Sequence, residues 1–201
     1  MRSERTIDVS DLSPVAIGHH APLWWGTAGM MAIEATMFAL VVAVYLYYGT
    51  TVDDWPPTGV RPPSLTIATV NLVLLVVSCF PTYFASEASA RDDPGGVANW
   101  LLLNLVCVVA FLVLRIVEWR GLAFTWDSHV YGSLVWTIFG LHTTHVVSAT
   151  FETLIIVIIV LTGRFGDKQR IGVDADSVYW YFVVGAWLPF YVLLFLVPAL
   201  R

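Results

Sequence analysis

Two histidines and a carboxylate, in the segment HTTHVVSATFE (142–152), have side chains that could bind a metal ion or move a proton. His142 and His145 are three residues apart, and Glu152 follows His145 by seven. Because two helical turns take about 7.2 residues, His145 and Glu152 share one helix face, about 10 Å apart. One straight helix cannot readily bring all three side chains to one metal ion. Their spacing therefore favours hydrogen bonds between helices over metal or haem binding.

Glu34 is a further ionisable group, in the middle of the apolar segment GMMAIEATMFAL. An ionisable residue inside a membrane is costly and usually functional. Its neighbours one turn away, Met30, Met37 and Phe38, offer no charge partner. Two hypotheses stay open: a carboxyl linked to a proton or a lipid headgroup, and a protonated acid hydrogen-bonded to another helix.

Arg115 and Glu118 are three residues apart near the end of another apolar segment. This spacing places both side chains on one helix face and predicts a structural ion pair near the membrane interface. The sequence has no Cys-x-x-Cys-His haem attachment motif, no closely spaced cysteines and no Gly-rich phosphate loop. We therefore predict no catalytic residue and no metal site in this chain.

The elements that carry these residues are predicted to be membrane helices. The chain has 201 residues, of which 58% are hydrophobic and 12% charged, whereas soluble domains have about 25% charged residues. A net charge of −5 argues against nucleic acid as a partner. Since a spanning helix needs about 20 apolar residues, we expect an all-α, polytopic membrane bundle with five transmembrane helices. They are expected at about 24–48, 65–86, 97–118, 132–162 and 178–199, in one membrane domain (24–201) behind an N-terminal tail (1–23).

The segments between these helices are rich in polar residues and helix breakers. DDWPPTGVRPP (53–63) predicts an extended cap, and RFGDKQRIGVDAD (164–176) predicts a polar loop. Pro81 and Pro189 are expected to kink or end their helices. Gly132, at the start of the fourth span, is expected to permit a close approach between helices.

Basic residues predict the orientation, because they are enriched on the cytoplasmic side. An N-in, C-out arrangement with a cytoplasmic tail places more of them inside than outside. The inner set is Arg2, Arg5, Arg91, Arg164, Lys168 and Arg170, and the outer set is Arg61, Arg120 and Arg201.

Several motifs then occur in a characteristic order over nearly the whole chain. They are WWG (24–26), MAIEATMFALVVAVYLYY (31–48), WPP (55–57), ATVNLVLLVVS (68–78), EW (118–119), FTWDSHVYGS (124–133), GLHTTHV (140–146) and VYWYFVVGAWLPFYVLLF (178–195). In this order they resemble subunit III of the haem-copper respiratory oxidases, the cytochrome c oxidase subunit III family. Five spans that start at the glutamate-bearing helix are similar to its short bacterial members.

The resemblance implies a non-redox accessory subunit in a bacterial plasma (inner) membrane. Such a subunit packs on oxidase subunit I among other respiratory subunits, holds phospholipids, and supports proton uptake and turnover stability during aerobic electron transport. Haem and copper belong to partner subunits. By this resemblance Glu34 matches the family's buried glutamate, and His142, His145 and Glu118 match its polar motif positions. Arg61 and Trp55 lie in the matching loop and are assigned to lipid.

Three positions depart from the pattern of this family. Tyr181 replaces a usual histidine, Val184 replaces a usual aspartate, and Glu152 stands at a usually apolar or small position. These departures leave room for an accessory protein of a nitric oxide reductase or of a divergent respiratory complex. Two further alternatives are an independent proton-coupled transporter that uses Glu34, His142, His145 and Glu152, and a small bis-histidine cytochrome.

Overall fold

The computed structural model describes residues 21–61 and 63–199, which form helices and connecting loops without a β-strand. Five helical segments in this part of the chain are long and apolar enough to cross a membrane. The predicted all-α bundle with five transmembrane helices is thereby confirmed, while most of the predicted tail (1–23) lies outside the described residues. The helices are α1 (Pro22–Thr51), α2 (Leu65–Val77), α3 (Cys79–Ala90), α4 (Pro94–Arg120), α5 (Val130–Leu161), α6 (Asp167–Tyr191), the π-helix η2 (Val192–Leu196) and α7 (Val197–Ala199).

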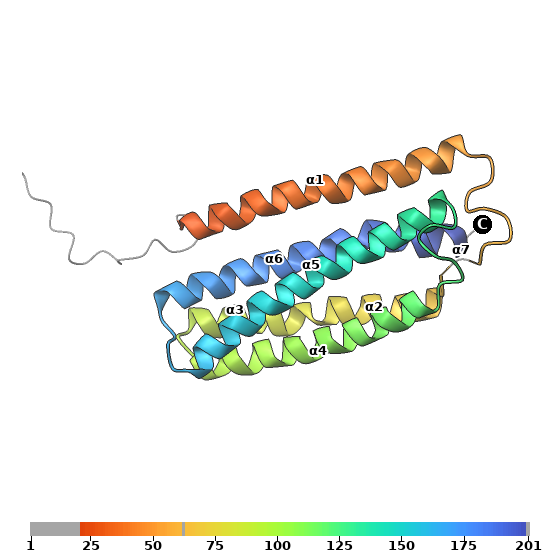
Figure 1. Cartoon of the computed structure of the whole chain (residues 1–201). Helices are drawn as coiled ribbons and strands as arrows, with labels where there is room; N and C mark the ends of the chain where they lie inside the picture. The colour runs from red at the N-terminus through yellow and green to blue at the C-terminus, as the bar shows by residue number, and fades with distance from the viewer. Residues whose placement is uncertain (1–20, 62, 200–201) are drawn as a thin grey trace, which may run out of the picture.

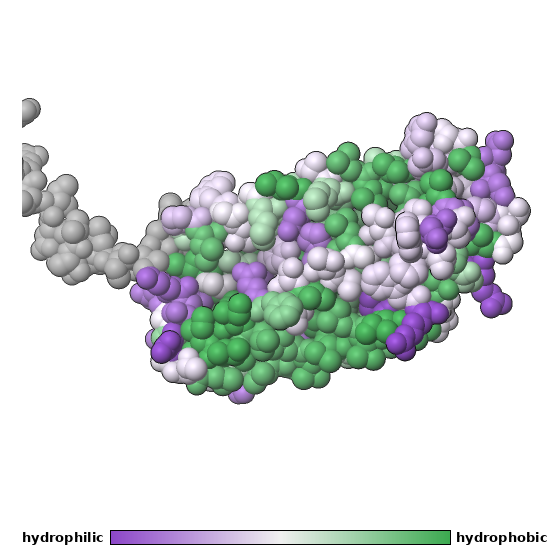
Figure 2. Space-filling model, viewed as in Figure 1, coloured by the Kyte–Doolittle hydropathy of each residue, from purple (hydrophilic) through white to green (hydrophobic). Residues whose placement is uncertain are grey.

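The five spans run side by side, each in the direction opposite to the one before it (Figure 1). Helix α6 contacts α1, α2, α3 and α5, whereas α1 lies at the edge of the bundle and packs mainly on α6. The face of the bundle that Figure 2 shows is most apolar in its lower part, and hydrophilic residues interrupt the surface above it, between α1 and α5. The fold therefore leaves a polar site on one side of the bundle.

Two spans contain irregular turns close to a proline. Pro81 lacks the N–H that would bond to the carbonyl of Val77, and the second span is broken at Ser78, between α2 and α3. The Ser78 hydroxyl donates to the Leu75 carbonyl (2.6 Å) and accepts from Trp180 Nε1 (3.0 Å). Pro189 lies inside α6, just before η2. The expected helix interruptions therefore occur near both prolines.

The prediction of a polar loop over 164–176 is wrong for most of this range. Helix α6 begins at Asp167, well before the expected start of the fifth span at 178. Its first turns bury apolar side chains such as Ile171 and Val173, and Arg170 forms an ion pair with Asp92 beyond the end of α3. Because its polar residues find partners on neighbouring elements, this charged segment is stable as a helix.

Candidate functional site

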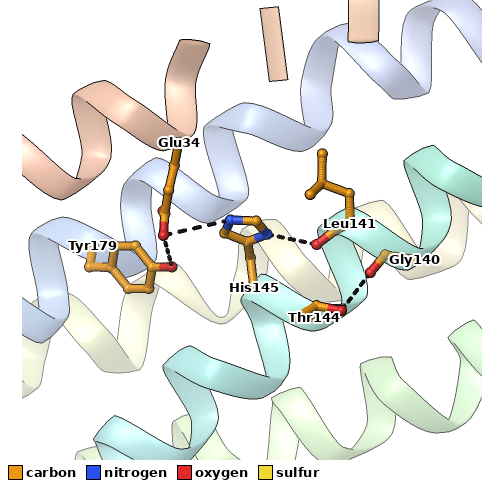
Figure 3. A network of polar contacts seen from close by, with 6 residues as sticks. All are labelled: Glu34, Gly140, Leu141, Thr144, His145 and Tyr179. Atoms are coloured by element: carbon orange, nitrogen blue, oxygen red, sulfur yellow. Dashed lines mark hydrogen bonds and ion pairs between the residues drawn. The ribbon is translucent and has the colours of Figure 1, made fainter. Parts of the chain in front are cut away.

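Glu34 is positioned by α1 so that its carboxyl points into the bundle, with 16% of the side chain exposed. The Tyr179 hydroxyl, from α6, donates to Glu34 Oε1 over 3.3 Å. The same oxygen lies 3.6 Å from His145 Nε2, from α5 (Figure 3). Helices α1, α5 and α6 thus meet at the Glu34 carboxyl. It has no charge partner on α1, but it contacts His145 of α5 and Tyr179 of α6.

The hydrogen bonds of His145 fix the position of its ring protons. His145 Nδ1 lies 2.7 Å from the carbonyl of Leu141, and a carbonyl can only accept, so Nδ1 carries hydrogen. In the neutral ring, Nε2 is then an acceptor that faces the Glu34 carboxyl. One proton can therefore sit on Glu34, as an acid beside a neutral imidazole, or on His145, as imidazolium beside a carboxylate.

A cavity of about 210 Å³ opens beside this pair. Both His145 and Glu152 line it, in agreement with the two-turn spacing that puts them on one face of α5. All but one of its lining residues have a polar group in the side chain, and the set is Met30, Glu34, Thr144, His145, Ser148, Glu152 and Tyr179. The cavity can accommodate water or another small polar group next to a proton-binding pair.

His142 lies on a different face of α5 and is completely buried. Its Nε2 is 3.2 Å from the carbonyl of Val183 on α6, so Nε2 donates and the ring has the Nε2–H tautomer. The imidazole packs on Trp187, with ring centroids 4.5 Å apart. This histidine joins α5 to α6 and takes no part in the Glu34 cavity.

Arg115 and Glu118 form a second polar group, in the interior of the bundle. Arg115 Nη1 lies 3.0 Å from Glu118 Oε2, and Asn71 Nδ2 from α2 donates to the same oxygen over 2.8 Å. The Arg115 guanidinium lies over three aromatic rings, at 4.0 Å from the centroid of Trp187, 4.8 Å from that of Phe139 and 5.0 Å from that of Phe111. The pair is a packed structural element that links α2, α4, α5 and α6.

Asp176 is a buried carboxyl that was not among the predicted site residues, because the predicted polar loop over 164–176 included it. Its two carboxyl oxygens lie 2.9 and 3.1 Å from the Thr153 hydroxyl on α5. The signal that could have found it is helical spacing: Val173, Asp176 and Trp180 are three and four residues apart and are all buried. Asp174, on the same helix, instead accepts from Ser86 on α3 over 3.3 Å.

The loop between α1 and α2 contains the two residues assigned to lipid. Trp55 inserts between aromatic side chains, with its ring centroid 5.4 Å from Tyr45 and 5.3 Å from Tyr131. Asp54 accepts from the backbone N–H of Thr58 (2.6 Å) and from its hydroxyl (2.7 Å), which lowers the pKa of this carboxyl. Arg61 is exposed near the end of the loop. The loop is thus held on α1 and α5 by Trp55 and presents Arg61 to its surroundings.

The arrangement offers no complete metal centre. Within residues 21–61 and 63–199, no three His, Cys, Asp or Glu side chains are grouped so that they could hold one ion. His142 uses Nε2 as a donor and His145 uses Nδ1 as a donor, and the two rings point to different places. The two histidines therefore do not converge on one site, and the acceptor nitrogen of His145 faces the Glu34 carboxyl.

Comparisons with known proteins place these features in context. A sequence model of the family described as "Cytochrome c oxidase subunit III" matches residues 18–198. The protein named cytochrome c oxidase subunit 3 from Synechocystis sp. is 26% identical, over 90% of this chain and 79% of its own length. Its namesake from Thermostichus vulcanus is 25% identical over 81% of both chains. The one from Homo sapiens is 26% identical, over 87% of this chain and 71% of its own length.

Proposed function

Because this chain belongs to the cytochrome c oxidase subunit III family, we propose that it is a non-redox accessory subunit of a respiratory haem-copper terminal oxidase. It serves the complex in which oxygen reduction is coupled to proton translocation, without a catalytic centre of its own. The observation that carries the proposal is the family match, which extends through all five spans. In this proposal haem and copper belong to partner subunits, and His142 and His145 join helices within this chain.

The outer surface of the bundle suits packing against subunit I and lipids. Much of α1 is exposed and apolar, and only Phe38 and Tyr45 of this helix are buried. A groove of about 440 Å³ between α1 and α6 is lined by Phe38, Phe182 and Phe190 among other apolar residues. We assign this groove to an acyl chain and Arg61, beside Trp55, to a phosphate headgroup, since guanidinium pairs well with phosphate.

The chain is a multi-pass membrane protein, which we place in the bacterial plasma (inner) membrane with its N-terminus inside and its C-terminus outside. In this orientation Arg91, Arg164, Lys168 and Arg170 lie on the inner side, where basic residues are enriched. Five crossings, an odd number, would put the two termini on opposite sides. Residues 1–23 then form a cytoplasmic tail and residues 24–201 the membrane domain.

The experiment that tests this function is gentle purification of the tagged chain from its native membrane. A reduced-minus-oxidised visible spectrum, identification of co-purifying proteins and an oxygen-consumption assay follow. We expect haem bands, a large multi-span partner and oxygen consumption. Haem bands with nitric oxide reduction instead would assign the chain to a different respiratory complex. A colourless chain without partners would reject the proposal.

Glu34→Gln tests the proton-linked role within this function. Glutamine keeps the size of the side chain and an oxygen that accepts from Tyr179, but it binds no exchangeable acid proton. We expect the complex to assemble normally and its oxygen consumption to decay severalfold faster during continuous turnover. The matched control is Glu87→Gln, which alters an exposed carboxyl at the end of α3. Equal decay in both variants would remove Glu34 from the mechanism.

A further inference from the structure

Two carboxyls, Glu152 and Asp176, lie between the cavity beside Glu34 and the end of the bundle where α5 ends and α6 begins. Glu152 lines the cavity itself. Asp176 is 2% exposed and close enough to Glu152 for the two carboxyls to interact electrostatically. Tyr179 donates to Glu34 Oε1 and lines the same cavity as Glu152. Acidic groups from α6, α5 and α1 thus follow one another toward the Glu34–His145 pair.

The surroundings of Asp176 can accommodate either of its protonation states. The Thr153 hydroxyl has one hydrogen and lies 3.0 Å from the carbonyl of Ala149, as well as close to both Asp176 oxygens. When Asp176 is a carboxylate, Thr153 donates to it. When Asp176 is protonated, it donates to the Thr153 oxygen, and Thr153 turns to Ala149. Rotation of one hydroxyl therefore accompanies the gain or loss of a proton.

The cavity can hold water next to Glu34. Its volume of about 210 Å³ has room for several molecules, since one water takes about 30 Å³ of liquid volume. Glu34 Oε2 is buried, and no described group of the protein donates to it. The hydroxyls of Thr144 and Ser148 also line the space, so water there has the several polar partners that a buried water molecule needs.

Asp176 lies close to the boundary of the hydrocarbon region. Helix α6 and its continuation cover 33 residues, Asp167–Ala199, whereas about 20 residues cross the hydrocarbon. The surplus lies at the start, because 167–176 contains all the charged residues of this span and the remainder is mostly apolar. Asp176 therefore stands where the polar part of α6 gives way to the apolar part.

The titratable groups around this path can each bind a proton. The titratable groups that face it are Glu34 from α1, His145 and Glu152 from α5, and Asp176 and Tyr179 from α6. Among the residues that line the cavity there is neither lysine nor arginine. Asp174 faces Ser86 of α3 instead. Arg115 faces His142 on another side of α5 and neutralises Glu118.

We propose that Asp176 and Glu152 form a proton-exchange route, completed by water in the cavity, from the aqueous phase at the start of α6 to the Glu34–His145 pair. A proton taken up at Asp176 passes through water to Glu152 and then to Glu34 Oε2, and each donor is returned to its carboxylate form. The route rests on the proton-linked role of Glu34 in the proposed function. It assigns the entry to Asp176 and Glu152, of which Glu152 stands at a position that is usually apolar or small in the family.

Hydrogen–deuterium exchange of the Glu34 acid, followed by infrared spectroscopy, tests the route without relying on oxidase activity. The complex is purified through this chain, held at a pH that protonates Glu34, and transferred to D₂O. The difference between wild type and Glu34→Gln identifies the carboxylic acid band of Glu34. The same band is then followed in Glu152→Gln, in Asp176→Asn and in the matched control Asp174→Asn.

We expect exchange to slow by at least about tenfold in Glu152→Gln and Asp176→Asn, because a positioned proton-transfer group typically contributes ~10²–10⁴-fold. Asp174→Asn should exchange at the wild-type rate. Unchanged exchange in the first two variants, equal slowing in all three, or the absence of a Glu34 acid band at any pH would overturn the route. Association with a haem-bearing partner, measured on the same samples, reports separately on the proposed function.

Discussion

Replacing Arg115 with alanine is expected to lower the free energy of unfolding by about 3–5 kcal/mol, the cost of removing one partner from a buried ion pair. The Arg115 and Glu118 side chains are 1% and 3% exposed. In Arg115→Ala the Glu118 carboxyl keeps only its hydrogen bond from Asn71. The variant also loses the guanidinium from between the rings of Trp187, Phe139 and Phe111.

The measurement is unfolding in mixed detergent micelles with increasing denaturing detergent, followed by tryptophan fluorescence. The matched control is Arg91→Ala, which breaks the ion pair of Arg91 with Glu87, also 3.0 Å long. The side chain of Arg91 is 69% exposed and that of Glu87 is 44% exposed. Exposed pairs contribute about 0–1 kcal/mol, so this variant should unfold close to the wild type. Arg115→Ala/Glu118→Ala should recover part of the loss, because no unpaired carboxyl remains. Equal stability of Arg115→Ala and Arg91→Ala would contradict a structural role for the buried pair.

The same region shows what spacing can and cannot predict. A separation of three residues on one helix was enough to pair Arg115 with Glu118. It could not supply Asn71 or Trp187, because both come from other helices, and a helix period carries no information on which face meets which neighbour. Glu34 had no charge partner on its own helix for the same reason. Its partners, His145 and Tyr179, are brought to it by the packing of α1 on α5 and α6.

The histidines show how a local pattern gains meaning from tertiary structure. Their three-residue spacing left both rings as candidates for one site, but the bundle turns His142 toward Val183 and His145 toward Glu34. Asp176 was missed for another reason. Hydropathy places the start of a span at its first apolar run, whereas α6 begins in a charged segment that is stabilised by contacts such as Arg170 with Asp92.

The second large effect is expected at Gly132, near the start of α5. A Cβ at this position would lie 2.7 Å from the backbone carbonyl oxygen of Thr125 and 3.2 Å from the His129 ring. The atoms that crowd it belong to the loop before α5, so the expected reason, close approach of another helix, is wrong. This loop is also fixed to the helix, since His129 Nδ1 accepts from the Gly132 N–H over 2.8 Å.

Gly132→Ala should therefore cost about 1–3 kcal/mol, as overpacking does, and Gly132→Leu should cost more and reduce assembly. The measurement is again the unfolding midpoint in mixed micelles, together with the yield of the intact complex. Gly185→Ala is the matched control, because a Cβ there meets no atom within 4 Å. Alanine is favoured over glycine inside a helix by up to about 1 kcal/mol, so this control should unfold at or above the wild-type midpoint. The two substitutions add the same methyl group to transmembrane helices. A lower unfolding midpoint for Gly132→Ala and a higher one for Gly185→Ala would locate the constraint in the contact with Thr125. Equal changes in the two midpoints would show that the loop before α5 can shift and that the start of α5 tolerates a side chain.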